Sequence, residues 1–222
     1  MAAGRGERLG SVGPKAFVVL GGRPMLDWSL DVLTASPHVG AVVVARPDGH
    51  LFDRAGVTVV AGGAQRSHSV RNALAAAPRD ADLVLVHDAA RPLLTGRIVD
   101  DCIAAMEDPA VDAAIAAAQL TDTVKQAESR DGRPVVRTTL DRSLLWAVQT
   151  PQVFRRSALE RVLAQPDEVL ARATDDASLI EAAGGRVVLV PSPRSNLKVT
   201  TPEDLQLAEL LLTTADTPSP SC

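Results

Sequence analysis

The chain has 222 residues, of which 46% are apolar and only 2% aromatic, with 27 acidic and 23 basic side chains. The net charge of −4 argues against generic nucleic-acid binding, which requires a basic surface, so any anion site has to be local. No apolar run approaches the roughly 18 residues of a membrane span, and we expect neither a span nor a signal peptide. The two cysteines, Cys102 and Cys222, lack metal-ligand spacing and indicate a reducing, cytoplasmic setting.

The first fifteen residues form a glycine-rich, cationic segment, Met1-Ala-Ala-Gly-Arg-Gly-Glu-Arg-Leu-Gly-Ser-Val-Gly-Pro-Lys15. Glycines let the backbone turn sharply and bring its N–H groups close to an anion, which larger side chains would obstruct. Arg8 and Lys15 add two full positive charges. This combination indicates a polyphosphate-binding loop.

After this loop, short apolar runs alternate with helix-forming segments. The predicted strands cover residues 41–45, 57–61, 83–86, 113–117 and 185–190. The predicted helices cover residues 24–33, 67–77, 98–106, 157–163, 177–183 and 202–212, the last with Thr201 as its N-cap. Apolar, β-branched runs of this kind are typical of strands covered on both faces, and the alternation predicts a layered α/β sheet. No internal linker interrupts it, so we expect one domain over residues 1–222, with a disordered tail from about residue 213.

A change of pattern between residues 122 and 140 predicts a projecting arm. Residues 122–128 and 134–140 alternate partly in polarity and are joined around Asp131-Gly132, which is a hairpin signal. Because no helix separates the two segments, we interpret them as an arm and a candidate dimer contact. An ordinary hairpin at the sheet edge is the alternative.

Two segments at predicted strand ends carry candidate site residues. Gly62-Gly-Ala-Gln-Arg-Ser-His-Ser69 follows a strand, at the sheet edge where ligands bind in α/β folds; alternatively it is a plain turn in which Ser67 or Ser69 caps a helix. His87-Asp-Ala-Ala-Arg-Pro92 ends the next strand. There Asp88 could hold a divalent cation and Arg91 a phosphate, or the two could form a structural ion pair.

Three later segments add weaker candidates. Residues 140–152 mix polar groups with Trp146 in a pattern that fits neither helix nor strand throughout, as segments lining a site often do. Residues 173–178 resemble a helix N-terminus, for which simple capping by Asp175 or Asp176 is a sufficient explanation. Lys198 follows the last predicted strand, where a single lysine is usually just solvated.

Together these segments closely resemble the 2-C-methyl-D-erythritol 4-phosphate cytidylyltransferases, from Ala2 to about Leu212. The motifs that carry the resemblance are Ala2-Ala-Gly-Arg-Gly-Glu-Arg8 with Pro14-Lys15, Gly62-Gly63 with Arg66 and Ser69-Val70, His87-Asp-Ala-Ala-Arg-Pro92, Asp122-Thr-Val-Lys125, Asp141-Arg142, Gln149-Thr-Pro-Gln152, Thr174-Asp-Asp-Ala-Ser178 and Asn196-Leu-Lys-Val-Thr200 with Pro202-Glu-Asp-Leu205. So many motifs in one order make the resemblance specific.

The resemblance implies a Rossmann-like, three-layer αβα fold of the nucleotide-sugar-transferase kind, with a projecting β-hairpin arm that joins a homodimer. It also implies a reaction: CTP and 2-C-methyl-D-erythritol 4-phosphate give the CDP-alditol and pyrophosphate, with Mg²⁺ as cofactor. Such an enzyme is expected in the cytoplasm, with no nucleic-acid or membrane partner.

The same resemblance assigns site residues. Those expected to bind CTP are Ala2, Ala3, Gly4, Gly6, Arg8, Lys15, Gly63, Ser69 and Ala89. Those expected to meet the sugar phosphate are Asp88, Arg91, Thr150, Thr174 and Lys198, with Thr123 and Arg142 reaching in from the partner subunit. Charge neutralisation by Arg8 and Lys15, and orientation of the incoming phosphate by Arg142 and Lys198, would carry catalysis. Asp88 is the expected metal ligand, and His87 is expected to be structural.

The sequence departs from the family pattern at two places. Family members begin with a buried strand ahead of the Ala-Ala-Gly motif, and Met1 stands where that strand should end. We therefore expect translation to begin upstream, and the 222-residue form to be unstable or poorly active, because a missing strand leaves ladder groups unpaired. Ala64-Gln65 and His68 occupy positions where relatives tend to carry acidic residues near the cytidine.

Alternative functions remain open from the sequence. A ribitol-5-phosphate cytidylyltransferase would share most of the motifs, and a truncated nucleotide-binding relic would bind CTP without turnover. A dinucleotide-binding oxidoreductase would also use a glycine-rich loop, but it requires a third glycine where this chain has Leu9.

Overall fold

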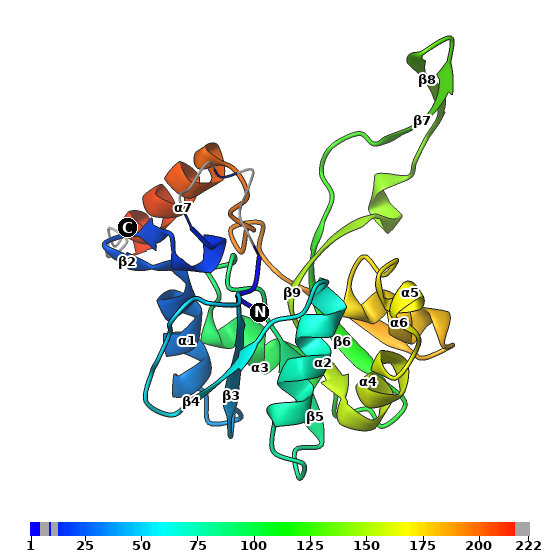
Figure 1. The fold of residues 1–222 in the computed structure, drawn as a ribbon. Helices are drawn as coiled ribbons and strands as arrows, with labels where there is room; N and C mark the ends of the chain where they lie inside the picture. Colours follow the sequence, from blue (N-terminus) through cyan, green and yellow to red (C-terminus); the bar gives the residue numbers. More distant parts are fainter. Residues whose placement is uncertain (5–8, 10–12, 216–222) are drawn as a thin grey trace, which may run out of the picture.

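A computed structural model describes residues 1–4, 9 and 13–215 of the chain (Figure 1). The helices of the described part are α1 (Met25–Ala35), α2 (Arg66–Ala76), α3 (Gly96–Ala104), α4 (Arg156–Leu163), α5 (Asp167–Leu170), α6 (Asp176–Ala182) and α7 (Pro202–Ala215). The strands are β1 (Val19–Leu20), β2 (Arg23–Pro24), β3 (Val42–Arg46), β4 (Val57–Ala61), β5 (Leu83–Val86), β6 (Ala113–Gln119), β7 (Lys125–Arg130), β8 (Arg133–Thr139), β9 (Trp146–Arg155) and β10 (Val187–Pro191). Single 3₁₀ turns lie at Lys15–Phe17 and Arg142–Leu144.

The main sheet has the strand order β10-β6-β9-β5. β10 runs parallel to β6, whereas β9 runs antiparallel to both β6 and β5. The α/β class is thus confirmed, but the sheet is mixed. β9 was not predicted as a strand, because it carries polar residues, including Gln149, Thr150 and Gln152, that are nevertheless buried. β3 and β4 form a separate parallel pair.

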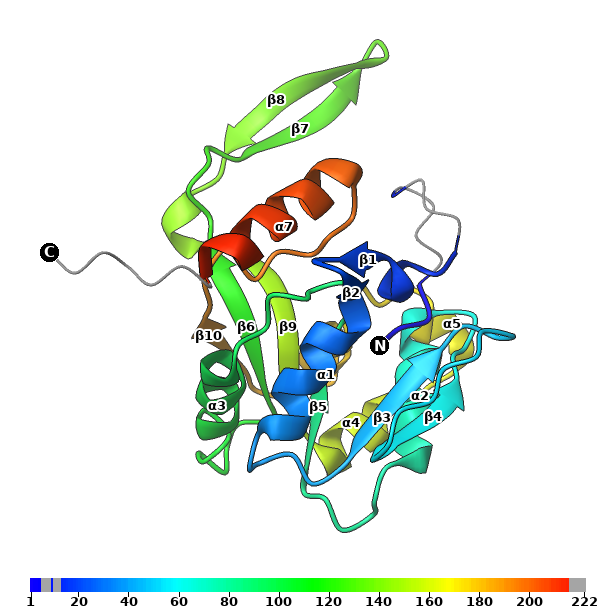
Figure 2. The ribbon, with the colours of Figure 1, turned by 90° about the vertical axis from the view of Figure 1, so that its left-hand side faces the viewer.

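Helices cover both faces of the main sheet, as Figures 1 and 2 show. Ala113 and Ile115 of β6 pack into a core cluster with residues of α2, α4 and α6. Their neighbours Ala114 and Ala116 pack on the opposite face, in a cluster that includes residues of α1 and α3. This alternation follows from the two-residue period of a strand. The predicted three-layer αβα arrangement is therefore confirmed.

The ends of α7 refine the prediction for the C-terminal segment. The Thr201 Oγ1 accepts a hydrogen bond from the Asp204 N–H at 3.3 Å, and the Asp204 carboxylate accepts from the Thr201 N–H at 2.9 Å. This reciprocal capping confirms Thr201 as the N-cap. The helix continues to Ala215, so residues 213–215 belong to the helix rather than to the predicted tail. Residues 216–222 lie outside the described part.

β7 and β8 form the predicted arm. Their connection is Asp131-Gly132, with φ of 50° and 73°, as a two-residue hairpin turn with positive φ at both positions requires. The two strands pair with each other, and no strand in the described residues extends their sheet. Figure 2 shows the hairpin standing away from the body. It is a projecting arm and not a hairpin at the edge of the main sheet.

The sheet is interrupted between β3 and β5. Within the described residues, β3 pairs only with β4, and β5 only with β9. Met1 and Ala2 bridge the gap at one end. The Met1 amine donates to His87 O, Met1 O accepts from the Ala89 N–H at 3.0 Å, and the Ala2 N–H donates to Ala45 O at 2.9 Å. Bonds to residues j−1 and j+1 of a neighbour are the pattern of a parallel ladder.

A groove of about 540 Å³ continues from Met1 between the two strand edges. Its walls are apolar side chains of α1 and α2, such as Leu30 and Leu74, and its sides are the edges of β3 and β5. The Met1 amine is buried, and burial lowers its pKa to about 6. The groove is thus an apolar slot between two strand edges, a shape that an extended, apolar segment would fill.

An apolar extension should therefore stabilise the fold. Adding five alternating valine and isoleucine residues before Met1, as many as β3 contains, should fill the groove and replace the buried amine with a peptide N–H. We expect a gain of about 2 to 4 kcal/mol in unfolding free energy, or about 5 to 10 °C in melting temperature. A glycine-serine extension of the same length is the control. Equal melting temperatures for the two extended proteins would contradict this interpretation of the groove.

Candidate active site

A polar pocket of about 670 Å³ lies where the N-terminal loop meets the ends of β4 and β5. Of the predicted site residues, it is lined by Ala2, Ala3, Gly4, Lys15, Gly63, Ser69, Asp88 and Lys198. These residues come from four distant segments of the chain. The structure thus brings together one half of the predicted site, including two of its predicted catalytic cations.

The Gly62-Gly63 turn is required by close packing. A Cβ on Gly62 would lie 2.5 Å from the Ala3 Cβ, and one on Gly63 would lie 2.4 Å from the His68 Cβ. The Ser69 Oγ accepts from the Gly63 N–H at 2.9 Å, which fixes the turn against α2. The N-cap of α2 is Gln65, so neither Ser67 nor Ser69 caps this helix. The turn therefore forms a closely packed wall of the pocket, held in place by this hydrogen bond.

This wall contains Ala64, Gln65 and His68, the positions at which we expect a departure from the resembled family. Ala64 and Gln65 are exposed and line the pocket. The His68 Nε2 lies 3.3 Å from the Asp167 Oδ1. This rim of the pocket therefore presents an amide, a methyl group and the backbone of the turn.

Asp88 is the electrostatic centre of the pocket. Its Oδ2 accepts from the Lys198 Nζ at 2.6 Å, and its Oδ1 accepts from the Arg66 Nε at 3.2 Å. Burial alone would raise the pKa of Asp88, but Arg66 and Lys198 outweigh it and hold the pKa well below its usual range. Asp88 is therefore ionised at neutral pH and pairs with these two cations, rather than with Arg91 as the sequence alternative had it.

Arg66 and Asp176 are functional candidates that sequence reasoning missed. Besides Asp88, Arg66 binds the Asp176 Oδ2 through its NH1 group. Asp176 is 1% exposed, and burial raises its pKa. The sequence places Arg66 in a motif without a role and explains Asp176 by capping, yet the observed N-cap is Asp175, whose Oδ1 accepts from the Ser178 N–H at 2.9 Å. The sequence did contain one signal. Because Asp175 is enough to cap the helix, the neighbouring Asp176 has no capping role and needs another partner.

His87 has a structural position, as predicted. Its Nε2 lies 3.2 Å from Arg91 O and 3.3 Å from the Ser29 Oγ, and its Nδ1 lies 3.1 Å from the Thr150 Oγ1. With the proton on Nε2, the ring donates to the Arg91 carbonyl and accepts from the Thr150 hydroxyl. Burial lowers the pKa of His87 to about 3. The neutral ring therefore ties the end of β5 to β9 and α1.

Thr150 and Arg91 lie behind the pocket and do not line it. The Thr150 Oγ1 accepts from the Asp88 N–H at 3.0 Å, so this hydroxyl holds the backbone under the Asp88 side chain. The Arg91 guanidinium donates to the carbonyls of Asn196 at 2.7 Å and Val148 at 3.2 Å. Their assignment to the sugar phosphate remains a prediction.

The other predicted residues lie elsewhere. Ala89 is buried beneath Met1, with its N–H on Met1 O. Thr174 is exposed, directly before the N-cap of α6. Thr123 and Arg142 are exposed at the base of the arm, where Arg142 donates to Thr121 O at 2.7 Å. Gly6 and Arg8 lie outside the described residues. The roles of these residues remain predictions.

The pocket offers one carboxylate to a metal. Asp88 is the only acid among the described residues that line it, and the described part of the chain contains no group of three side chains able to hold a metal ion. Magnesium is usually held by one or two carboxylates together with substrate phosphates. These residues therefore fit a magnesium ion as a companion of bound phosphate, with Asp88 as its protein ligand.

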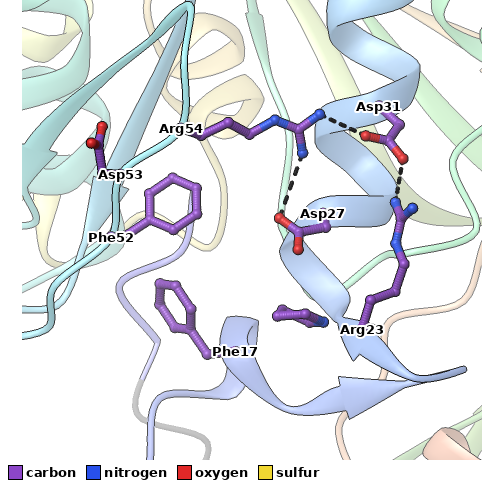
Figure 3. Close-up of a pocket in the computed structure, with 8 residues that line it drawn as sticks. Phe17, Arg23, Asp27, Asp31, Phe52, Asp53 and Arg54 are labelled. Carbon is purple, nitrogen blue, oxygen red and sulfur yellow. Dashed lines mark hydrogen bonds and ion pairs between the residues drawn. The ribbon is translucent and has the colours of Figure 1, made fainter.

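A second hollow of about 580 Å³ lies beside α1 (Figure 3). Arg54 donates to the Asp31 Oδ1 at 2.6 Å and lies 3.5 Å from Asp27, and Arg23 pairs with the other Asp31 oxygen. None of the predicted site residues lines this hollow. Four of its charged groups pair with one another, and the pairs of Arg54 connect α1 to the segment between β3 and β4. None of the described helices is long and apolar enough to cross a membrane.

Burial of His87 predicts an acid-dependent loss of stability. The folded pKa of about 3 lies below the ordinary 6.5, so between these values the unfolded chain binds the extra proton. Stability is therefore full above pH 6.5 and falls as the pH drops, by up to about 1.4 kcal/mol per pH unit. Urea unfolding of wild type and His87→Gln from pH 6.5 to 4.5 should show a shallower slope for the variant. Parallel curves would contradict a neutral, buried ring.

Comparison of the sequence with known proteins gives one consistent result. The family profile of 2-C-methyl-D-erythritol 4-phosphate cytidylyltransferase matches residues 1–214. A protein of that name from Frankia casuarinae is 49% identical over 223 aligned residues, covering 97% of this chain and 80% of the relative. Another, from Rubrobacter xylanophilus, is 42% identical and covers 96% of this chain and 92% of the relative.

Solved structures agree with the sequence comparison. The crystal structure of 2-C-methyl-D-erythritol 4-phosphate cytidylyltransferase from Thermus thermophilus matches with a TM-score of 0.79 and 33% identity, covering 96% of this chain and 100% of that one. The corresponding protein from Francisella tularensis matches with a TM-score of 0.79 and 30% identity, covering 94% and 95%. The similarity thus extends over nearly the whole chain.

Proposed function

This chain belongs to the 2-C-methyl-D-erythritol 4-phosphate cytidylyltransferase family, and we propose that its polar pocket transfers CMP from CTP to 2-C-methyl-D-erythritol 4-phosphate, a step of isoprenoid precursor biosynthesis. The observation that carries the proposal is the convergence of Lys15, Arg66 and Lys198 on one pocket, walled by the Gly62-Gly63 turn. In an acidic chain, such a local concentration of cations and backbone suits a polyphosphate.

The reaction needs positioning more than reactive side chains. A phosphate oxygen of the acceptor attacks the α-phosphorus of CTP, a new P–O bond forms, and the bond to the β-phosphate oxygen breaks to release pyrophosphate. The acceptor phosphate supplies its own nucleophilic oxygen, so no covalent intermediate and no general base are required. Lys15 and Lys198 would neutralise charge and hold the two anions together.

The choice of acceptor rests on the comparisons. The matching family profile and the relatives named above specify the methylerythritol phosphate. They favour neither the ribitol 5-phosphate alternative nor a non-catalytic relic, and they place the chain among transferases rather than oxidoreductases.

We propose Mg²⁺ as the cofactor, with Asp88 as its protein ligand beside the phosphates of CTP. When bound, the ion would neutralise part of the charge on those phosphates. Asp88 already pairs with Lys198 and Arg66, so the carboxylate stays ionised, and the metal ion would share its oxygens with these two side chains.

We propose a homodimer joined through the arm. β8 is exposed along its whole length, and Val136 on it is 58% exposed, which suits a protein contact. Arg142 and Thr123 lie at the base of this arm and do not line the pocket of their own chain. A second copy could therefore receive them in its pocket, which would make each site a product of two chains.

We also propose a cytoplasmic enzyme. Cys102 is a free, buried thiol whose pKa burial raises to about 12, so it behaves as a small apolar core residue. A reducing compartment suits a chain that uses a cysteine in this way.

The proposed function is tested by pyrophosphate release from CTP with each alditol phosphate separately. We expect turnover with 2-C-methyl-D-erythritol 4-phosphate and little with ribitol 5-phosphate. Lys15→Ala should lower turnover by about 10²- to 10³-fold with an unchanged melting temperature, because it removes a cation that acts on developing charge. Arg97→Ala, which removes an exposed cation on α3, is the matched control. CTP binding without turnover in the wild type would point to the relic instead.

The shared site is tested with mixed dimers. Lys15→Ala and Arg142→Ala homodimers should both be nearly inactive. A purified heterodimer of the two contains one site with both residues intact, so it should regain about half of the wild-type turnover. Size measurements establish the dimer in each sample. A confirmed heterodimer without recovered turnover would place the whole site within one chain.

A further inference from the structure

Four charged side chains form a row that starts in the core and ends at the pocket. Asp176 binds Arg66, Arg66 binds Asp88, and Asp88 binds Lys198. Acidic and basic side chains alternate along the row. Side-chain exposure is 1% for Asp176 at the buried end and 45% for Lys198 at the pocket end. The inner end is thus fixed by packing, while the outer end faces the space where substrates would bind.

Arg66 links the buried end of this row to the pocket end, because it binds both Asp176 and Asp88. It is the first residue of α2, whereas Asp88 follows β5 and Asp176 begins α6. Its Nε and NH1 groups bind the two carboxylates separately. Although burial alone would lower the pKa of Arg66, the two carboxylates raise it. A planar guanidinium can hold two carboxylates at a set angle, which a lysine ammonium cannot do.

The row limits where Lys198 can lie. The Asp88 carboxylate is held on one oxygen by Arg66 and on the other by Lys198, while its own backbone N–H is held by the Thr150 hydroxyl. Because the backbone and the Oδ1 atom of Asp88 are both held, its Oδ2 atom has one position, and this is the atom that Lys198 binds. A long, half-exposed lysine would otherwise sample many rotamers.

We infer that Arg66 is a positioning residue, which acts through Asp88 to hold the Lys198 ammonium where the acceptor phosphate binds. This inference rests on the proposed function, because it takes Lys198 to be the group that meets the acceptor. Arg66 also ties the turn on the CTP side of the pocket to the start of α6, beside Thr174. One guanidinium thereby fixes the position of the CTP subsite relative to the subsite for the acceptor phosphate.

The test compares Arg66→Lys with the wild type in steady-state kinetics. The lysine keeps the positive charge but cannot hold both carboxylates at a set angle. We expect kcat/KM for the acceptor phosphate to fall about 10- to 100-fold, as for a misplaced orienting group, while KM for CTP changes less. Arg71→Lys is the matched control, since Arg71 lies on the same helix and pairs with the exposed Asp167. An unchanged kcat/KM for the acceptor in Arg66→Lys would overturn the inference.

A second pair of variants separates positioning from stability. Arg66→Met leaves Asp176 buried without its cation and should lower the melting temperature. Adding Asp176→Asn removes the buried charge and should recover most of that loss, while kcat/KM for the acceptor stays low. Recovery of the acceptor kinetics together with the melting temperature would show a merely structural role and overturn the inference. A wild type without turnover would instead overturn the proposed function, and this inference with it.

Discussion

The Asp88 carboxylate is the point at which the separate parts of the site are held together. It receives a cation from α2 on one oxygen and a cation from the segment after β10 on the other. Asp88 can do this because it stands two residues after the end of β5, where the backbone leaves the sheet edge that faces ligands in folds of this kind. Its charge is stable there, because two neighbouring cations outweigh the cost of burial. Without this carboxylate, Arg66 and Lys198 would repel one another across the pocket.

Most of the fold could be predicted because local patterns and tertiary packing agree. The β-branched runs that became β3, β4 and β5, and the Thr201 cap of α7, each indicate their structure within a few neighbouring residues. β9 could not be predicted in this way. Its buried Gln149, Thr150 and Gln152 each hydrogen-bond to a partner from another segment, such as the Asn196 side chain and the Asp88 N–H. Those partners are visible only once the chain is folded.

The same distinction between local and long-range features decides which parts of the site could be predicted. Backbone features of the pocket were predictable, because Gly62 and Gly63 indicate a turn that cannot carry side chains. The long-range ion pairs were not. Arg66 and Asp176 are 110 residues apart, and neither position alone distinguishes a buried partner from a solvated charge. Residues on the arm are a third case, because a single chain does not contain the surroundings proposed for Arg142.

The buried Asp176 indicates what the row of charges is for. A buried ion pair often gives less stability than apolar side chains of similar volume would give, so stability alone does not account for an aspartate that is 1% exposed. The need to orient the Arg66 guanidinium does account for this buried aspartate. An ion pair fixes the angle of a guanidinium, whereas apolar packing would leave its charge unoriented. A reaction whose nucleophile and leaving group both belong to its substrates depends on the placement of cations, and placement is what a carboxylate anchored in the core can supply.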